Sequence, residues 1–332
     1  MKKLIMALTV VLSGVLGIAG HANASCGKIT IAEMDWASAE FIANLDKIIL
    51  EKGFGCEVEL VPGATMTTFA SMDSKGVPQI APELWANAVQ TPLKKAVSEN
   101  RMAVLNGAPI TDAGEGWMID AKTAKAHNLK TLADVLARPD LFPNPEDASK
   151  GGIVTCPSGW GCQIATGQLF KAFDMESKGW TIIESGSSAG LNGTIEKALT
   201  RKDSWFGYYW GPTVLASRAG LVLIDMGEFA GNDNWDNCLM VADCSNPKPS
   251  GWVTSVVTTA VTSDFLKEGS EASQQYIGKR QFPGDVMQSM LIWMYENQAS
   301  GEDTSYEFLA KHPDIWKSWV TSDAASKIGA AL

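Results

Sequence analysis

Short apolar runs alternate with amphipathic segments along the first part of the chain. The expected elements are a strand at 28–34, a helix at 38–52 ended by Gly53, a strand at 56–63, a helix at 65–76 and a strand-like segment at 77–85. This order predicts a parallel βαβαβ unit. Its right-handed crossover places the ends of the first and third strands at one edge of the sheet, together with Trp36 and Trp85. Ligands of α/β folds bind at that edge.

A second unit with the same alternation is expected from about Ala121 to about Ser250. Its predicted elements are helices at 131–142, 164–173 and 194–201 and strands at 151–156, 180–185 and 204–210. A return strand at 252–262 and helices at 265–280, 283–298, 305–312 and 315–320 follow, and these helices are expected to pack on the first unit. The Gly-rich run Gly114-Glu115-Gly116 is a candidate hinge. We therefore predict one lobe from 25–114 with 252–332, and a second lobe from 115–251.

The first 24 residues have the pattern of a cleaved signal peptide. Lys2 and Lys3 precede an apolar stretch, and Ala22-Asn23-Ala24 supplies small residues for cleavage after Ala24. The stretch is short and broken by glycine, and no later segment approaches roughly 18 continuous apolar residues. The leader predicts an exported, periplasmic protein. The mature chain of 332 − 24 = 308 residues exceeds the usual size of a single core, which agrees with two lobes.

All six cysteines follow the leader, and an even number in an exported chain indicates disulfides. Six cysteines allow about 15 connectivities, so the pairing rests on proximity alone. Proximity favours Cys26–Cys56, Cys156–Cys162 and Cys238–Cys244. The chain has no CxxC motif or nearby histidine, which disfavours zinc.

The chain is acidic. Its formal net charge is −10 and becomes −12 when Lys2 and Lys3 leave with the leader. This charge argues against nucleic acid and anionic membranes as partners. We expect a monomer that binds a small molecule.

The positions of tryptophan carry the strongest functional signal. Five of the twelve lie within two residues of glycine, proline or a carboxylate, where strands or loops are expected to end: Trp36, Trp85, Trp117, Trp160 and Trp210. Indole faces attract cations, so converging rings suit a quaternary ammonium group, which has no hydrogen-bond donor of its own. We expect six of the other seven to be packing residues, namely Trp180, Trp235, Trp252, Trp293, Trp316 and Trp319.

Four segments carry a resemblance to a known family. PELWANAV, GEGWMID, PSGWGCQIATGQLFKAF and SWFGYYWGPTVLA occur in the order seen in glycine betaine/choline-type substrate-binding proteins of ABC importers. The resemblance implies a two-lobed periplasmic binding protein of type II, an α/β fold with two mixed sheets flanked by helices that closes on its ligand like a Venus flytrap. It also implies delivery to an ABC permease in the inner membrane, with no catalysis and no cofactor.

The resemblance places the family's aromatic box at Trp36, Trp85, Trp160 and Trp210 of this chain. It places an additional wall of that box at Trp117. Glu115 and the crowding of tryptophan resemble the branch that binds trimethylamine N-oxide, in which a carboxylate meets the oxygen of the ligand or complements its positive head. Glu83 is an alternative carboxylate. The candidate ligands all have a methylated, positively charged head group: choline, glycine betaine, trimethylamine N-oxide and dimethylsulfonium osmolytes. Contacts with the rest of the ligand, its tail, therefore determine which of them binds.

A carboxylate tail would need donors such as the backbone amides of residues 156–162 or of Ser187 to Gly190. Few basic residues lie near the expected cage, which favours a small or neutral tail. A binder of polar amino acids or sugars is disfavoured for the same reason.

Two other interpretations are compatible with the sequence, a calcium site and a hydrolase. Asn232, Asn234, Asp236 and Asp243 have a spacing similar to that of calcium loops, although Asn237 replaces the turn glycine. Gly186 to Gly190 matches the GxSxG motif of hydrolases with Ser188 as nucleophile. Only His127 and His312 could complete a triad, and Leu191-Asn192-Gly193 is expected to delay the helix that such a motif requires.

Overall fold

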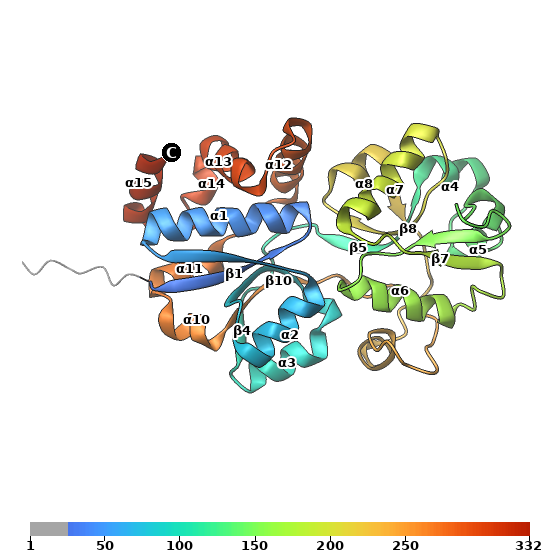
Figure 1. Cartoon of the computed structure of the whole chain (residues 1–332), viewed down its shortest axis with the longest axis horizontal. Coiled ribbons are helices and arrows are strands. Elements are labelled where there is room, and N and C mark those ends of the chain that lie inside the picture. The colour runs from blue at the N-terminus through green and yellow to red at the C-terminus, as the bar shows by residue number, and fades with distance from the viewer. Residues whose placement is uncertain (1–25) are drawn as a thin grey trace, which may run out of the picture.

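The computed structural model describes residues 26–332, so the predicted signal peptide lies outside the described residues. The chain forms two lobes, each built on a five-stranded sheet with helices on both faces (Figure 1). The strand orders are β2-β1-β3-β10-β4 and β7-β6-β8-β5-β9. Each sheet contains parallel and antiparallel pairs, so the prediction of two mixed sheets flanked by helices is confirmed.

The first lobe opens with the predicted βαβαβ unit. Strand β1 pairs in parallel with both β2 and β3. The elements of this part are β1 (Lys28–Met34), α1 (Ala37–Phe54), β2 (Glu57–Gly63), α2 (Thr65–Lys75), β3 (Ile80–Trp85), the 3₁₀ turn η1 (Ala86–Ala88), α3 (Gln90–Ser98) and β4 (Met102–Asn106). Every residue of β3 is buried, as expected for the central strand of a covered sheet.

Helix α1 ends two residues later than predicted. Gly53 lies inside the helix, where a Cβ atom would be 3.1 Å from Ile328 of α15 (Ser322–Ala331), so its role is close packing between helices. Gly55 ends α1 instead, with φ of 72°; its N–H donates to the carbonyl of Glu51, and the N–H of Cys56 donates to the carbonyl of Leu50. A left-handed residue at this position satisfies helix carbonyls that would otherwise lack partners, and glycine adopts it without steric cost.

The second lobe repeats the arrangement. Strand β6 pairs in parallel with β7 and β8. The elements are β5 (Gly114–Asp120), α4 (Ala121–His127), α5 (Leu132–Leu136), η2 (Pro139–Leu141), β6 (Gly151–Val154), α6 (Gly161–Ala172), β7 (Trp180–Ile183), α7 (Ser188–Arg201), β8 (Phe206–Gly211), α8 (Val214–Ala219), β9 (Leu221–Leu223), α9 (Asn232–Asn234) and the π-helical turn η3 (Trp235–Leu239).

The antiparallel strand of each sheet is the first strand after the chain crosses between the lobes. Strand β5 follows the first crossing and runs antiparallel to β8 and β9, whereas β10 (Val257–Thr262) follows the return crossing and runs antiparallel to β3 and β4. The predicted hinge residues Gly114 to Gly116 are already paired with β8, so they begin a strand instead of forming a linker. The division of the chain at residues 114 and 252 stays a prediction.

The C-terminal helices pack on the first lobe, as Figure 1 shows. They are α10 (Ser263–Glu268), α11 (Glu271–Lys279), α12 (Gly284–Asn297), α13 (Gly301–Lys311), α14 (Pro313–Trp316) and α15. The single helix predicted at 265–280 is two helices, because Gly269 adopts an extended conformation and the Ser270 side chain caps α11 by accepting the N–H of Ser273. Helix α15 was not predicted.

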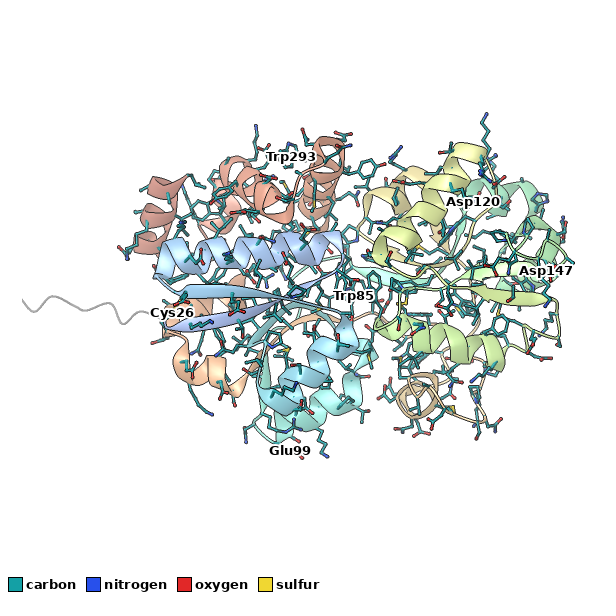
Figure 2. The ribbon with its side chains drawn as sticks, in the orientation of Figure 1. Cys26, Trp85, Glu99, Asp120, Asp147 and Trp293 are labelled. Atoms are coloured by element: carbon teal, nitrogen blue, oxygen red, sulfur yellow. A yellow bond between two sulfur atoms is a disulfide. The ribbon has the colours of Figure 1, made fainter. Side chains whose placement is uncertain are left out.

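All three disulfides have the pairing that proximity favoured, Cys26–Cys56, Cys156–Cys162 and Cys238–Cys244. Within the described residues, no helix combines the length and apolarity needed to cross a membrane. Figure 2 shows side chains filling the space between the helices and the sheets, with Trp85 near the junction of the two lobes.

Candidate functional site

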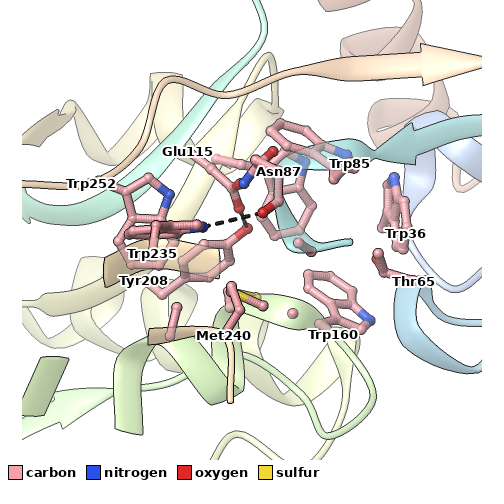
Figure 3. Close-up of a pocket in the computed structure, with 15 residues that line it drawn as sticks. Trp36, Thr65, Trp85, Asn87, Glu115, Trp160, Tyr208, Trp235, Met240 and Trp252 are labelled. Atoms are coloured by element: carbon pink, nitrogen blue, oxygen red, sulfur yellow. Dashed lines mark hydrogen bonds between the residues drawn. The ribbon is translucent and has the colours of Figure 1, made fainter. Parts of the chain in front are cut away.

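A cavity lies between the lobes and is lined largely by aromatic rings (Figure 3). Its lining residues are Trp36, Thr65, Trp85, Asn87, Ala88, Glu115, Trp160, Gly161, Cys162, Ala165, Tyr208, Trp210, Trp235, Met240 and Trp252. Five of the six residues predicted for a ligand site are therefore brought together here. That they bind a ligand stays a prediction.

Each of the four box tryptophans lies at the edge of a secondary-structure element. Trp36 precedes the first residue of α1 and Trp85 is the last residue of β3, both in the first lobe. Trp160 precedes the first residue of α6, and Trp210 lies near the end of β8, both in the second lobe. The Cys156–Cys162 disulfide closes the loop that carries Trp160. Each lobe thus supplies two rings.

The rings meet across the boundary between the lobes. The centroid of Trp160 is 5.1 Å from that of Trp36 and 5.2 Å from that of Trp210, with interplanar angles of 72° and 76°. These are edge-to-face contacts, which aromatic pairs favour. Trp160 therefore connects the rings of the two lobes.

Carboxylates hold the polar edges of three box rings. The indole N–H groups of Trp36 and Trp85 both donate to Oε1 of Glu83, at 2.7 and 3.0 Å. The N–H of Trp160 donates to Asp35 of the other lobe, at 2.8 Å. Because these edges have partners outside the cavity, the carbon surface of the rings is left to face a ligand.

Glu115 forms a polar point in the cavity wall. Its Oε1 accepts a hydrogen bond from Nδ2 of Asn87 at 2.6 Å, and its Oε2 accepts one from the Tyr208 hydroxyl. Oδ1 of Asn87 accepts the N–H of Val256, which fixes the orientation of the amide. Burial raises the pKa of Glu115, and the bonds from Tyr208 and Asn87 oppose that rise. Burial also raises the pKa of Tyr208, so its phenol stays protonated.

Glu83 is buried behind the rings and does not line the cavity. Its Oε1 accepts a third hydrogen bond, from the Ser38 hydroxyl at 3.0 Å, whereas its Oε2 has no partner among the described residues. Burial raises the pKa of Glu83 to about 7, against the lowering effect of the bonds from Trp36, Ser38 and Trp85. This carboxyl group therefore changes its protonation state near neutral pH.

Trp117 does not line the cavity, contrary to the sequence prediction. Trp117 lies on the same sheet face as Glu115. It is two residues further along β5, so it lies roughly 6–7 Å deeper in the lobe. Its N–H donates to Thr166 of α6, and its ring contacts Phe173 and Phe206. Trp117 is completely buried core.

Sequence reasoning missed several lining residues. Trp235 and Trp252 were expected to be packing residues, yet they line the cavity with rings 5.3 Å apart. Tyr208 precedes Trp210 by two residues, so the alternation of a strand places both on one face and could have identified it. Asn87 and Met240 carried no comparable signal, because only the meeting of the lobes brings them to the site.

The two lobes also contact each other directly. Across the boundary, the N–H of Met66 donates to the carbonyl of Gly159 at 3.0 Å, and the Thr91 hydroxyl donates to Asp236 at 2.9 Å. At Gly161, a Cβ atom would lie only 2.3 Å from the Cβ of Ala88. The structure is therefore closed, and this glycine permits the close approach.

Three of the four predicted calcium residues lie in helical turns instead of a loop, and Asp243 lies in a turn after them. Asn232 and Asn234 belong to α9, and Asp236 belongs to η3. Residues two apart on a helix point to different sides. Asn234 also bonds to the backbone of Lys248, and Asp236 bonds to Thr91. Calcium binding thus stays a prediction without support from this arrangement, and residues 26–332 contain no cluster of three or more histidine, cysteine or acidic side chains suited to a metal.

Comparison with known proteins defines the family. Residues 27–311 match the substrate-binding domain of ABC-type glycine betaine transport systems. The chain is 28% identical over 110 residues to the glycine betaine/proline betaine-binding periplasmic protein of Salmonella typhimurium, a match that spans 32% of each protein. The chain thus aligns with about a third of the length of that curated relative.

Solved structures show the same fold. A choline-binding protein of an ABC transporter in complex with choline has a TM-score of 0.72 at 16% identity, covering 92% of this chain and 98% of its own. A glycine betaine/L-proline-binding protein from Borrelia burgdorferi has a TM-score of 0.70 at 16% identity, covering 91% of this chain and 99% of its own. The chain belongs to the family of substrate-binding domains of ABC-type glycine betaine transport systems, which confirms the resemblance noted in the sequence.

The hydrolase interpretation of Ser188 is wrong, because members of this family bind transport substrates and are not enzymes. The motif has a structural explanation. The Ser187 side chain caps α7 by accepting the N–H of Gly190 at 3.0 Å. The helix begins at Ser188, earlier than predicted, and Leu191 is buried within it.

Gly161→Ala tests the closed contact. The added methyl group would collide with Ala88 of the other lobe, so we expect the lobes to stay further apart, with a larger radius of gyration by small-angle X-ray scattering. Gly167→Ala is the matched control, because it lies on the same helix with no atom within 4 Å of an added Cβ. An unchanged radius for Gly161→Ala would contradict the closed arrangement.

Glu83→Gln tests the burial of that carboxyl group. The unfolded chain ionises it near pH 4.5 and the folded protein near pH 7, so the folded state binds more protons between these values. Its stability therefore falls as the pH rises through that window. Denaturant unfolding should show Glu83→Gln more stable than the native protein by about 2–3 kcal/mol at pH 8 and little changed near pH 4.5. Glu40→Gln is the control, and an equal effect at both pH values would contradict the prediction.

Proposed function

We propose that this protein captures a methylated-amine osmolyte in a tryptophan cage and delivers it to an ABC permease in the inner membrane. The observation that carries the proposal is the convergence of Trp36, Trp85, Trp160 and Trp210 from two lobes around a single cavity. Each indole face over a desolvated onium group contributes roughly 1–2 kcal/mol. Four faces supply about 4–8 kcal/mol before the cost of association, and micromolar binding requires about 8.2 kcal/mol net, so burial of the apolar surface of the ligand must add to the contribution of the rings.

The charges around the cavity support a ligand with a positive head. Glu115 lies in the wall, and Glu83 and Asp35 accept the N–H groups of the cage rings from behind. No lysine, arginine or histidine lines the cavity within the described residues. An onium head would therefore encounter mainly aromatic rings, with the carboxylate of Glu115 in the wall.

The same charges bear on the tail of the ligand. An anionic tail would find no basic side chain in the cavity, so its donors would have to be uncharged, such as the Thr65 hydroxyl or the backbone amides at the start of α6, where Gly161 and Cys162 line the wall. Ser187 to Gly190, the other predicted source of amides, do not line the cavity. We therefore propose trimethylamine N-oxide or choline ahead of glycine betaine, with a dimethylsulfonium osmolyte as the alternative.

Closure couples binding to delivery. The ligand contacts rings from both lobes at once only in the closed state, so binding favours closure. The closed form, which a permease would recognise, is thereby present mainly when cargo is bound. We propose a periplasmic monomer, consistent with the predicted leader and with the periplasmic relative.

Calorimetry with tryptophan fluorescence tests this function. The panel is trimethylamine N-oxide, choline, glycine betaine, carnitine and dimethylsulfoniopropionate, with a polar amino acid and a sugar as negative controls. We expect Trp85→Ala and Trp160→Ala each to weaken binding by about 5- to 30-fold, because each removes one ring face. Trp293→Ala, a partly buried tryptophan of α12 outside the cavity, should bind normally.

Two results would count against the proposal. A protein that bound none of the methylated compounds would not have this function. If Trp85→Ala and Trp160→Ala kept full affinity for a ligand that does bind, the cage would lie elsewhere.

A further inference from the structure

We propose that Glu83 is a positioning residue of the tryptophan cage and the counter-charge for a cationic ligand head, acting through the rings of Trp36 and Trp85 without touching the ligand. The proposal rests on the function proposed above, because it requires a methylated onium ligand. It adds a role for a buried side chain that does not line the cavity.

The positioning role follows from a single oxygen atom. Oε1 of Glu83 accepts the N–H groups of both Trp36 and Trp85, and these are the two box rings of the first lobe. Glu83 lies on β3 two residues before Trp85, so both side chains project from the same face of the sheet. Trp36 reaches the same oxygen from the start of α1. One carboxylate therefore fixes how both rings are turned toward the cavity.

The charge of Glu83 is poorly compensated within the first lobe. Arg280 is the basic group that lowers its pKa, but Nε of Arg280 lies 2.7 Å from Oδ1 of Asp46, and its Nη2 donates to Pro82 and Thr259. Tyr276 also donates to Asp46, at 2.6 Å. Arg280 is thus paired with another carboxylate. Glu83 also contributes to the raised pKa of Tyr208 in the second lobe, but Tyr208 is uncharged and offers no counter-charge.

A cationic ligand would supply the missing counter-charge. Oε2 of Glu83 is buried without a partner among the described residues, and burial raises the pKa of the group to about 7. An onium head in the cage would be separated from this carboxylate by the indole rings, in a medium that screens charge less than water does. Hydrogen bonding to an ionised acceptor is also stronger than to a neutral one, so ionisation holds the two rings more firmly.

Thermodynamic linkage makes the proposal measurable. If the ligand favours ionised Glu83, ligand binding lowers the pKa of Glu83, and the proton leaves to the solvent. Affinity for a cation must then rise as the pH rises through 7. A side chain with only a structural role would show neither the release of a proton nor this dependence on pH.

The experiment compares the native protein with Glu83→Gln, using choline and tetramethylammonium as cationic probes. Glutamine keeps the length of the side chain and one oxygen acceptor but carries no charge. We expect roughly tenfold weaker binding of both cations at pH 8 and equal binding near pH 5.5, where native Glu83 is itself protonated. Calorimetry at pH 7 in two buffers of different ionisation enthalpy should show less proton release for Glu83→Gln than for the native protein.

Two further variants separate charge from position. Glu83→Asp keeps the charge but shortens the reach to the indole N–H groups, so it should weaken binding while the rise of affinity with pH remains. Glu40→Gln removes a carboxylate of α1 that bonds to the N–H of Gly301, and it should leave affinity and its pH dependence unchanged.

Three results would overturn the proposal. They are equal cation binding by Glu83→Gln and the native protein at pH 8, a loss of affinity that is the same at pH 5.5 and pH 8, and binding of trimethylamine N-oxide without measurable binding of either cation. A native protein that binds no methylated amine at all would instead contradict the proposed function, so the two failures are distinguishable.

Discussion

The site depends on how the tryptophan rings are held by their edges. An indole has one polar group, its N–H, and a large apolar surface. Here the N–H groups of Trp36, Trp85 and Trp160 donate to carboxylates outside the cavity. With the polar edges satisfied there, the carbon surface is what remains for the interior of the cage. The same bonds give each ring a defined orientation, which packing between apolar surfaces alone would not specify.

This arrangement also joins the two lobes. Asp35 belongs to the first lobe and accepts the N–H of Trp160 from the second, while Asn87 of the first lobe donates to Glu115 of the second. The closed state is therefore held by directional bonds as well as by contacts between rings. The cost falls on the buried carboxylates of Glu83 and Glu115, whose ionised forms lose hydration. Buried carboxylates of this kind occur at sites where their charge has a use, and the cationic ligand proposed here would provide one.

Much of the fold followed from local patterns. The βαβαβ opening, the second α/β unit and the three disulfide pairs were all recognisable because each depends on residues close in sequence or on a strict period. The errors lie where a single residue has two possible roles. Gly53 could end a helix or permit close packing, and only the position of α15 shows that it does the latter. Gly269 divides a predicted helix through its backbone conformation, which the apolar period does not reveal.

The candidate site also contains residues that the sequence identified and residues that only the structure revealed. The sequence by itself determined which tryptophans end strands and begin helices, and those positions correctly brought Trp36, Trp85, Trp160 and Trp210 to one cavity. The sequence could not show how deep in the lobe a residue of β5 lies. Trp117 was therefore predicted in the cavity wall, although it lies two residues beyond Glu115 and is buried against Thr166. Nor could the sequence identify Trp252, Asn87 or the role of Glu83, because these depend on segments that are far apart in the chain and meet in space. Local periodicity sets the face on which a side chain lies, whereas burial, hydrogen-bond partners and the charge state of a carboxylate are set by its neighbours in space.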